Sequence, residues 1–123
     1  MKILVAEDSS TIRRLVAARL AADGYEVVEA ADGEEALTLA RVLRPDLIVL
    51  DKVMPKLDGF EVVRILRDDP ATRGLPIVML TERASEEDVL GGLKLGVEEY
   101  MPKPFSPHEL SARVRRVLSR TRL

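Results

Sequence analysis

The feature that most constrains the fold is a short apolar run at residues 47–50, Leu-Ile-Val-Leu, which ends in Asp51 and lies between Pro45 and Pro55. An apolar run without alternation is typical of a strand covered on both faces, as in the middle of a parallel sheet. In open α/β sheets, ligands bind at the carboxyl ends of the strands. A carboxylate is costly to bury alone, so this run leaves two roles open for Asp51, a loop cap or a member of a ligand site.

Four other segments have strand character, and a helix-start signal follows each of the five strands. The expected strands are residues 2–6, 25–30, 76–80 and 97–101, in addition to 47–50. Ser, Thr, Asp and Asn favour the position before a helix, and a Glu three residues later strengthens the signal. The signals are Ser9 or Ser10, Asp32 with Glu35, Asp58 with Glu61, Ser85 with Asp88, and Ser106 with Pro107 and Glu109.

Apolar residues at helical spacing follow most of these signals and predict the buried face of each helix. Gly24, Pro45 and the pair Asp69-Pro70 mark where the first three helices end. The fourth helix contains Gly91-Gly92, which makes it the weakest, because each glycine inside a helix costs roughly 0.5–1 kcal/mol. The inward positions are Ile12, Leu15, Val16 and Leu20; Leu37, Ala40 and Leu43; Phe60, Val63 and Leu66; and Leu110, Val114, Val117 and Leu118.

Five strands alternating with five helices predict an α/β fold, a doubly wound parallel sheet with helices on both faces. With 123 residues, the chain suits a single domain spanning residues 1–123.

The absence of cysteine excludes thiol catalysis and disulfides, and the single histidine, His108, provides too few nitrogen ligands for a multi-histidine zinc site. A net charge of −2 gives no reason to expect nucleic acid as a partner. No apolar run approaches the length of a membrane span or a signal peptide, so we expect a cytoplasmic protein.

Polar residues follow four of the five predicted strands, and parallel strands place their carboxyl ends at one edge. Glu7 and Asp8 follow the first strand, Asp51 the third, Thr81 the fourth and Lys103 the fifth. Three neighbouring carboxylates repel one another and need a cation. Oxygen ligands without Cys or His favour Mg²⁺. A hydroxyl and an ammonium beside them suit a phosphoryl group, whose oxygens the metal, Thr81 and Lys103 would share.

These residues resemble the receiver domains of two-component response regulators, and the resemblance covers essentially the whole chain. It rests on the acidic pair after the first strand, the strand-Asp-x-x-Met-Pro segment, a strand ending in Thr81, the aromatic residue Tyr100, and Lys103-Pro104. The resemblance implies a flavodoxin-like strand order, 2-1-3-4-5. It also implies a phosphorylation-dependent signalling switch rather than an enzyme, with a sensor histidine kinase or phosphotransfer protein as partner.

The same resemblance implies a role for each site residue. Asp51 is the expected phosphoacceptor, served by a kinase or a small acyl phosphate. Mg²⁺ is expected on Asp8, Asp51 and the backbone carbonyl of Val53, with Glu7 in a looser contact through water. Many family members have Asp at the position of Glu7, whose side chain is one methylene longer. Lys103 pairs with the phosphoryl group and precedes a cis peptide bond. Thr81 and Tyr100 form the expected switch pair, relaying the change to the face of helix four, strand five and helix five.

Other readings remain open at this point. Tyr100 also suits a core aromatic residue, and the C-terminal arginines suit either a helix C-terminus or a partner surface. Glu82 and Arg83 are expected at the rim of the site.

Haloacid-dehalogenase-like enzymes also form a phosphorylated aspartate during their reaction. They have a second Asp, the general acid, two residues after that nucleophile, where this chain has Val53. Open as well are a receiver-like module that is never phosphorylated, an output domain beyond residue 123, and weak homodimerisation in which Glu99 and Arg113 pair between subunits.

Overall fold

The computed structural model describes residues 1–82, 90–91 and 94–121 of the chain. In chain order the elements are β1 (Lys2–Ala6), α1 (Ser10–Ala22), β2 (Glu26–Ala30), α2 (Gly33–Leu43), β3 (Leu47–Asp51), α3 (Gly59–Asp68), β4 (Ile77–Thr81), β5 (Glu99–Pro102) and α5 (Pro107–Thr121). Strands and helices alternate as predicted from β1 to β4, and α5 follows β5, whereas most of the segment between β4 and β5 lies outside the described residues.

The sheet has five strands in the order β2-β1-β3-β4-β5, and every neighbouring pair is parallel. This confirms the predicted fold class and strand order. Strands β3 and β4 are buried along their whole length, which explains their unbroken apolar sequences. The register places Asp51 beside Leu80 and Thr81 beside Pro102, so the ends of β3, β4 and β5 lie level.

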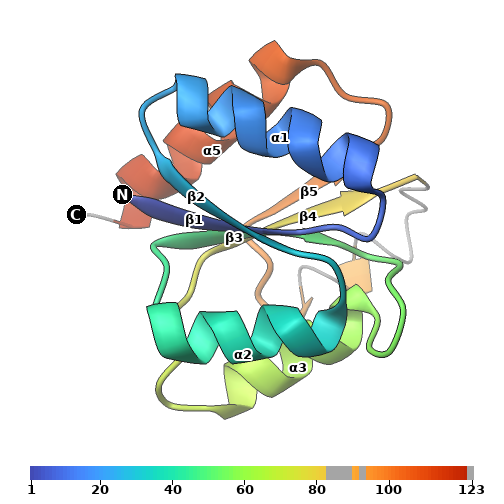
Figure 1. Ribbon diagram of the computed structural model, residues 1–123. Helices are drawn as coiled ribbons and strands as arrows, with labels where there is room; N and C mark the ends of the chain where they lie inside the picture. Colours follow the sequence, from blue (N-terminus) through green and yellow to red (C-terminus); the bar gives the residue numbers. More distant parts are fainter. Residues whose placement is uncertain (83–89, 92–93, 122–123) are drawn as a thin grey trace.

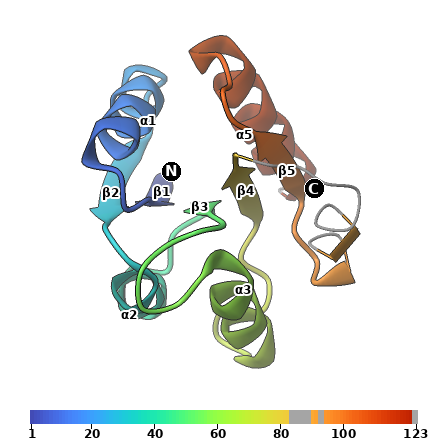
Figure 2. The ribbon, with the colours of Figure 1, turned by 90° about the vertical axis from the view of Figure 1, so that its right-hand side faces the viewer.

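Helices cover both faces of the sheet (Figures 1 and 2). Helices α1 and α5 pack on one face, and α2 and α3 pack on the other. The core is divided accordingly. One cluster joins Val16 and Leu20 to the inward residues of α5, and a second joins α2 and α3 to the opposite side of the strands. No helix in the described part of the chain combines the length and the apolarity that crossing a membrane requires.

Four of the predicted helix starts are confirmed. The side chains of Ser9, Asp32 and Asp58 accept hydrogen bonds from backbone N–H groups of the helices that they precede. Ser106 does the same for Glu109, at 3.0 Å. Asp58 and Glu61 form a reciprocal capping box. In α2 the reciprocal bond differs from expectation, because Glu35 accepts from the N–H of Ala31 instead of that of Asp32.

Some details differ from the sequence prediction. Strand β5 begins at Glu99, not at residue 97, although Val97 is buried and therefore resembles a strand residue. Leu15 is not on the buried face of α1 but is 67% exposed. In α3, Val62 is buried, whereas Phe60 is only partly buried. Most of the predicted fourth helix, including Ser85 and Gly92, lies outside the described residues.

Candidate functional site

A cavity of about 390 Å³ opens at the carboxyl edge of the sheet. The loops after β1, β3, β4 and β5 all contribute to it, as expected for a ligand site in a parallel α/β fold. Six of the seven residues predicted for the site line this cavity, and the seventh, Tyr100, does not. The lining residues are Glu7, Asp8, Ser9, Ile12, Asp51, Lys52, Val53, Thr81, Glu82 and Lys103.

Three carboxylates meet inside this cavity. One oxygen from each of Glu7, Asp8 and Asp51 lies within 4.8 Å of the other two. The side chains of Glu7 and Asp51 are almost completely buried, whereas Asp8 is exposed. Burial of Glu7 was not predicted. It follows from the backbone, because the N–H of Glu7 donates to the carbonyl of Ala30 and thereby continues the pairing of β1 with β2.

Lys103 brings a positive charge to these carboxylates. Its Nζ lies 2.7 Å from an oxygen of Glu7 and 3.2 Å from an oxygen of Asp51. The loop after β5 sets this position, because the N–H of Lys103 donates to the carbonyl of Thr81. The peptide bond from Lys103 to Pro104 is cis, as expected. The lysine therefore lies where it could also contact an anion bound beside Asp51.

Burial and neighbouring charges change the acidity of two of these groups. Burial, and then the neighbouring Asp51, raise the pKa of the Glu7 carboxyl to about 8, although Lys103 acts in the opposite direction. Burial lowers the pKa of the Lys103 ammonium, but the hydrogen bond to Glu7 and the charge of Asp51 outweigh this effect, and its pKa is raised overall. Lys103 thus keeps its charge, while Glu7 holds a proton more readily than an exposed glutamate.

The cluster fits a hard divalent cation. Three carboxylates converge on one point, and oxygen ligands are the kind that Mg²⁺ prefers. The second carboxylate oxygen of Glu7 is buried and has no hydrogen-bond partner among the described residues. A buried oxygen of this kind is costly unless something satisfies it, and a cation between the carboxylates would do so.

The remaining predicted residues lie at different depths. Thr81 is buried at the end of β4, and its position beside Asp51 and Lys103 fits contact with a shared anion. Val53 lines the cavity with its side chain 70% exposed. Tyr100 is buried in the core cluster on the α2–α3 side of the sheet and does not line the cavity. Glu82 lies at the cavity as expected, and Arg83 lies outside the described residues.

Two positioning residues were not predicted. Arg13 donates to the backbone carbonyl of Glu7 at 2.9 Å and to the Glu29 carboxylate at 3.1 Å, which fixes the loop after β1. Gly59 packs so closely on β3 that a Cβ there would lie 2.6 Å from the carbonyl oxygen of Asp51. Only the Asp-Gly pair at the start of α3 hinted at this close approach. Neither role depends on a pattern within one segment, so sequence periodicity could not reveal it.

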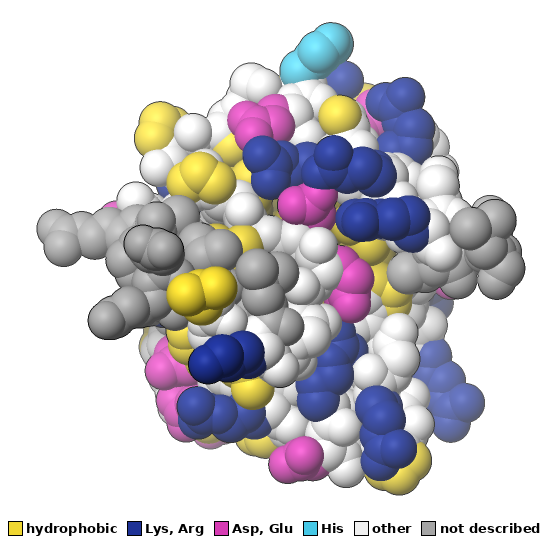
Figure 3. All heavy atoms as spheres, turned by 180° about the vertical axis from the view of Figure 1, so that it is seen from behind, with side chains coloured by type: hydrophobic (Ala, Val, Ile, Leu, Met, Phe, Trp, Pro, Cys, Tyr) yellow, Lys and Arg dark blue, Asp and Glu magenta, His cyan; other side chains and the backbone are white. Residues whose placement is uncertain are grey.

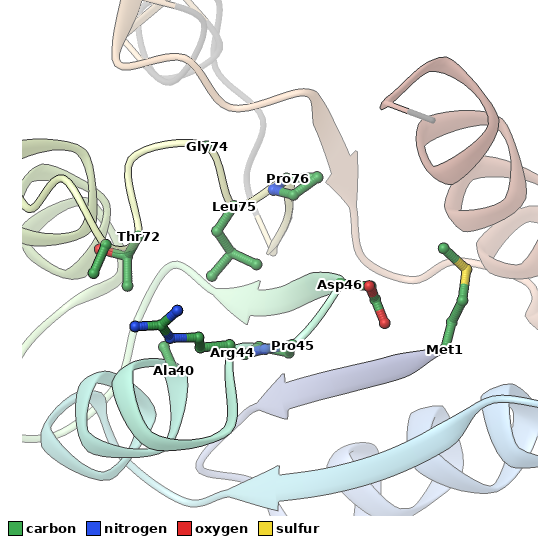
Figure 4. A pocket seen from close by; sticks show the side chains of 10 residues that line it. Met1, Ala40, Arg44, Pro45, Asp46, Thr72, Gly74, Leu75 and Pro76 are labelled. Carbon is green, nitrogen blue, oxygen red and sulfur yellow. The ribbon is translucent and has the colours of Figure 1, made fainter. Parts of the chain in front are cut away.

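A second cavity lies at the opposite edge of the sheet (Figure 4). Met1, Asp46 and Pro76 line it, and they precede β1, β3 and β4 respectively. The Asp46 carboxylate there accepts a hydrogen bond from the backbone N–H of Lys2 at 2.8 Å. This edge carries the amino ends of the strands, and among the described residues it brings together no group of three carboxylates. The carboxyl edge is therefore the better candidate for chemistry.

Curated relatives resemble this chain along almost all of its length. A probable transcriptional regulator, ycf27, from Cyanophora paradoxa is 52% identical over 98% of this chain, and the match covers 49% of the relative. The alkaline phosphatase synthesis transcriptional regulatory protein PhoP of Bacillus subtilis is 48% identical over 99% of this chain and 50% of its own length. The chain thus spans about half the length of these relatives.

Solved structures agree with this similarity. The receiver domain of Francisella response regulator 1452 superposes with a TM-score of 0.91 at 38% identity, covering 98% of each chain. The chemotaxis protein CheY4 of Vibrio cholerae gives 0.89 at 40% identity, covering 94% of this chain and 97% of its own. The family model of the response regulator receiver domain matches residues 3–115. With its parallel sheet and the acidic cavity at the carboxyl edge, the chain belongs to the response regulator receiver domain family.

Proposed function

We propose that this chain is a single receiver domain, residues 1–123, that switches when Asp51 accepts a phosphoryl group. The observation that carries the proposal is the arrangement around Asp51. Two further carboxylates lie within 4.8 Å, and the Lys103 ammonium lies 3.2 Å away. This arrangement places a nucleophilic oxygen beside positive charge and beside ligands for a cation. The site therefore suits the transfer of a phosphoryl group to a carboxylate.

Magnesium would be held by Asp8, Asp51 and the backbone carbonyl of Val53, with Glu7 as a looser contact. When bound, Mg²⁺ supplies positive charge that offsets the carboxylates and the phosphoryl oxygens. The Asp51 oxygen attacks phosphorus. The bond from phosphorus to a histidine nitrogen or an acyl oxygen breaks, and its electron pair departs with that atom. The ammonium of Lys103 then pairs with the new phosphoryl oxygens.

The partner would be a sensor histidine kinase or a phosphotransfer protein, and the output would act through another part of the signalling protein or a separate target. The two curated relatives are named as transcriptional regulators and are about twice as long as this chain. We accordingly propose signalling, with Thr81 and Tyr100 relaying the phosphorylated state towards β5 and α5. Dimerisation of the isolated chain through that face would be weak at most.

Phosphorylation of Asp51 by acetyl phosphate tests the proposal. Incubation with Mg²⁺ should add one phosphoryl group in intact-mass analysis, and chelation of the metal with EDTA should abolish the addition. The variant Asp51→Asn should gain nothing, because an amide cannot act as the nucleophile. Asp46→Asn, at the opposite edge of the sheet, is the matched control and should be modified like the wild type. An Asp51→Asn protein that still gains the group would disprove the assignment.

A further inference from the structure

An apolar groove lies between α1 and the start of α5, directly beside the acidic cavity. It encloses about 600 Å³, a volume in the range of small-molecule sites, roughly 300–1,000 Å³. Leu15 and Val16 line it from α1, and Phe105 and Leu110 line it from the other side. Leu15 is 67% exposed although its helical spacing suits a core position. Val16 and Leu110 belong to the core and form the floor of the groove, whereas Leu15 and the partly buried Phe105 present apolar surface at its sides.

The groove and the acidic cavity adjoin and share part of their walls. Ile12, Glu82 and Lys103 line both of them. A molecule whose phosphoryl group lies beside Asp51 and Lys103 can therefore extend its remaining atoms into the groove. Among the described residues, Arg19 is the one other charged residue on the groove wall. Its guanidinium is already engaged, donating to Ser111 at 2.7 Å and pairing with Asp23 at 3.6 Å. The groove thus offers apolar surface to what enters.

We propose that this groove binds the acyl part of a small phosphodonor and favours aromatic acyl phosphates over acetyl phosphate. The inference rests on the proposed phosphorylation of Asp51. An Asp51 oxygen forms the new bond to phosphorus while the bond from phosphorus to the acyl oxygen breaks. The electron pair leaves with that oxygen, so an aromatic carboxylate departs and no proton is required. The aromatic ring gains apolar contact in the groove, whereas the methyl group of acetyl phosphate is too small to reach most of its wall.

The test compares benzoyl phosphate with acetyl phosphate at equal, subsaturating concentrations with Mg²⁺. The readout is the initial rate of Asp51 phosphorylation by intact mass, corrected for the hydrolysis of each donor in buffer. Wild type should prefer benzoyl phosphate about tenfold, which corresponds to ~1.4 kcal/mol of ring burial. Leu15→Gln should lower this ratio at least about threefold, because it removes part of the apolar wall. Val42→Gln, at another exposed apolar residue, on α2, is the matched control and should keep the wild-type ratio.

Each outcome decides between the proposals. If acetyl phosphate modifies Asp51 but benzoyl phosphate reacts no faster, the groove proposal is wrong and the proposed function stands. If Leu15→Gln and Val42→Gln change the ratio equally, the preference does not arise in the groove, and the proposal is again wrong. If neither donor modifies Asp51, the proposed function and this inference fail together.

Discussion

Glu7 is the residue whose behaviour depends most on the assembled site. The sequence marks it as one of two acidic residues after a strand, and only the structure shows that it is the buried one. Burial and Asp51 raise its pKa to about 8, whereas the pKa of a glutamate in an unfolded chain is about 4.3. Between these values the folded chain binds more protons than the unfolded chain. The free energy of unfolding therefore falls as the pH rises through this window.

We predict that Glu7→Gln removes most of this fall when the metal is chelated. Because a neutral amide does not ionise, the free energy of unfolding of the variant should rise relative to that of the wild type by on the order of 1–3 kcal/mol between pH 5.5 and pH 8.5. Urea unfolding in EDTA at both pH values measures the difference. Glu34→Gln makes the same chemical change on the exposed surface of α2 and should follow the wild type. Parallel profiles for the wild type and Glu7→Gln would show that Glu7 does not titrate in this range.

At the scale of elements, Arg67 joins three parts of the chain near the amino ends of β4 and β5. Its guanidinium donates to the backbone carbonyls of Leu75 and Gly96 at 2.6 Å each and pairs with Glu98 at 3.0 Å. Glu98 in turn accepts a hydrogen bond from the N–H of Ile77.

Arg67→Met should lower the free energy of unfolding by about 1.5–3 kcal/mol, since several acceptors lose a charged donor. Arg64→Met, on the exposed side of the same helix, should change it by less than about 0.5 kcal/mol. Equal losses in urea unfolding would contradict this role.

The elements also show how far sequence reasoning extends. Strands β3 and β4 could be predicted because burial on both faces demands uninterrupted apolar residues, and capping residues such as Asp58 act on their own helix. Contacts between distant segments leave no such periodic trace. For this reason Gly59 against Asp51, and Arg67 with Glu98, became visible only in the fold. In the candidate site, strand ends predicted which residues meet, but not that Glu7 is buried and Asp8 exposed.

At the scale of the whole molecule, α5 presents arginines to solvent (Figure 3). Arg113, Arg116 and Arg120 all pair with Glu99 of the same chain. Glu99 and Arg113 were candidates for a contact between subunits, and within this chain they already contact each other. A dimer through this face would have to replace these ion pairs within each chain by equivalent pairs between the two chains. The other positive charges on the two α5 helices would repel one another. This charge arrangement supports the expectation of weak self-association.

Backbone contacts form a continuous path from Asp51 to this face. The N–H of Lys52 donates to the carbonyl of Leu80 at 2.8 Å, and the N–H of Lys103 donates to the carbonyl of Thr81. Tyr100 lies beside Met79 in the sheet register. A phosphoryl group adds about −1.5 to −2 charges and three acceptor oxygens beside Asp51. A shift of Thr81 towards those oxygens would therefore move the ends of β4 and β5 together.

We predict that beryllium fluoride with Mg²⁺, a mimic of the phosphoryl group, changes amide exchange mainly within residues 81–105. Converting a population of about 1:99 into 99:1 requires roughly 5.5 kcal/mol of preference, which several charge-assisted bonds around Asp51 could supply. Thr81→Ala should reduce the change in β5 because its hydroxyl is lost, whereas Thr38→Ala, on the exposed surface of α2, should leave it intact. The measurement is hydrogen–deuterium exchange with and without the mimic. If the changes were confined to α1 and α2 while residues 81–105 stayed silent, the proposed relay through Thr81 and Tyr100 would be wrong.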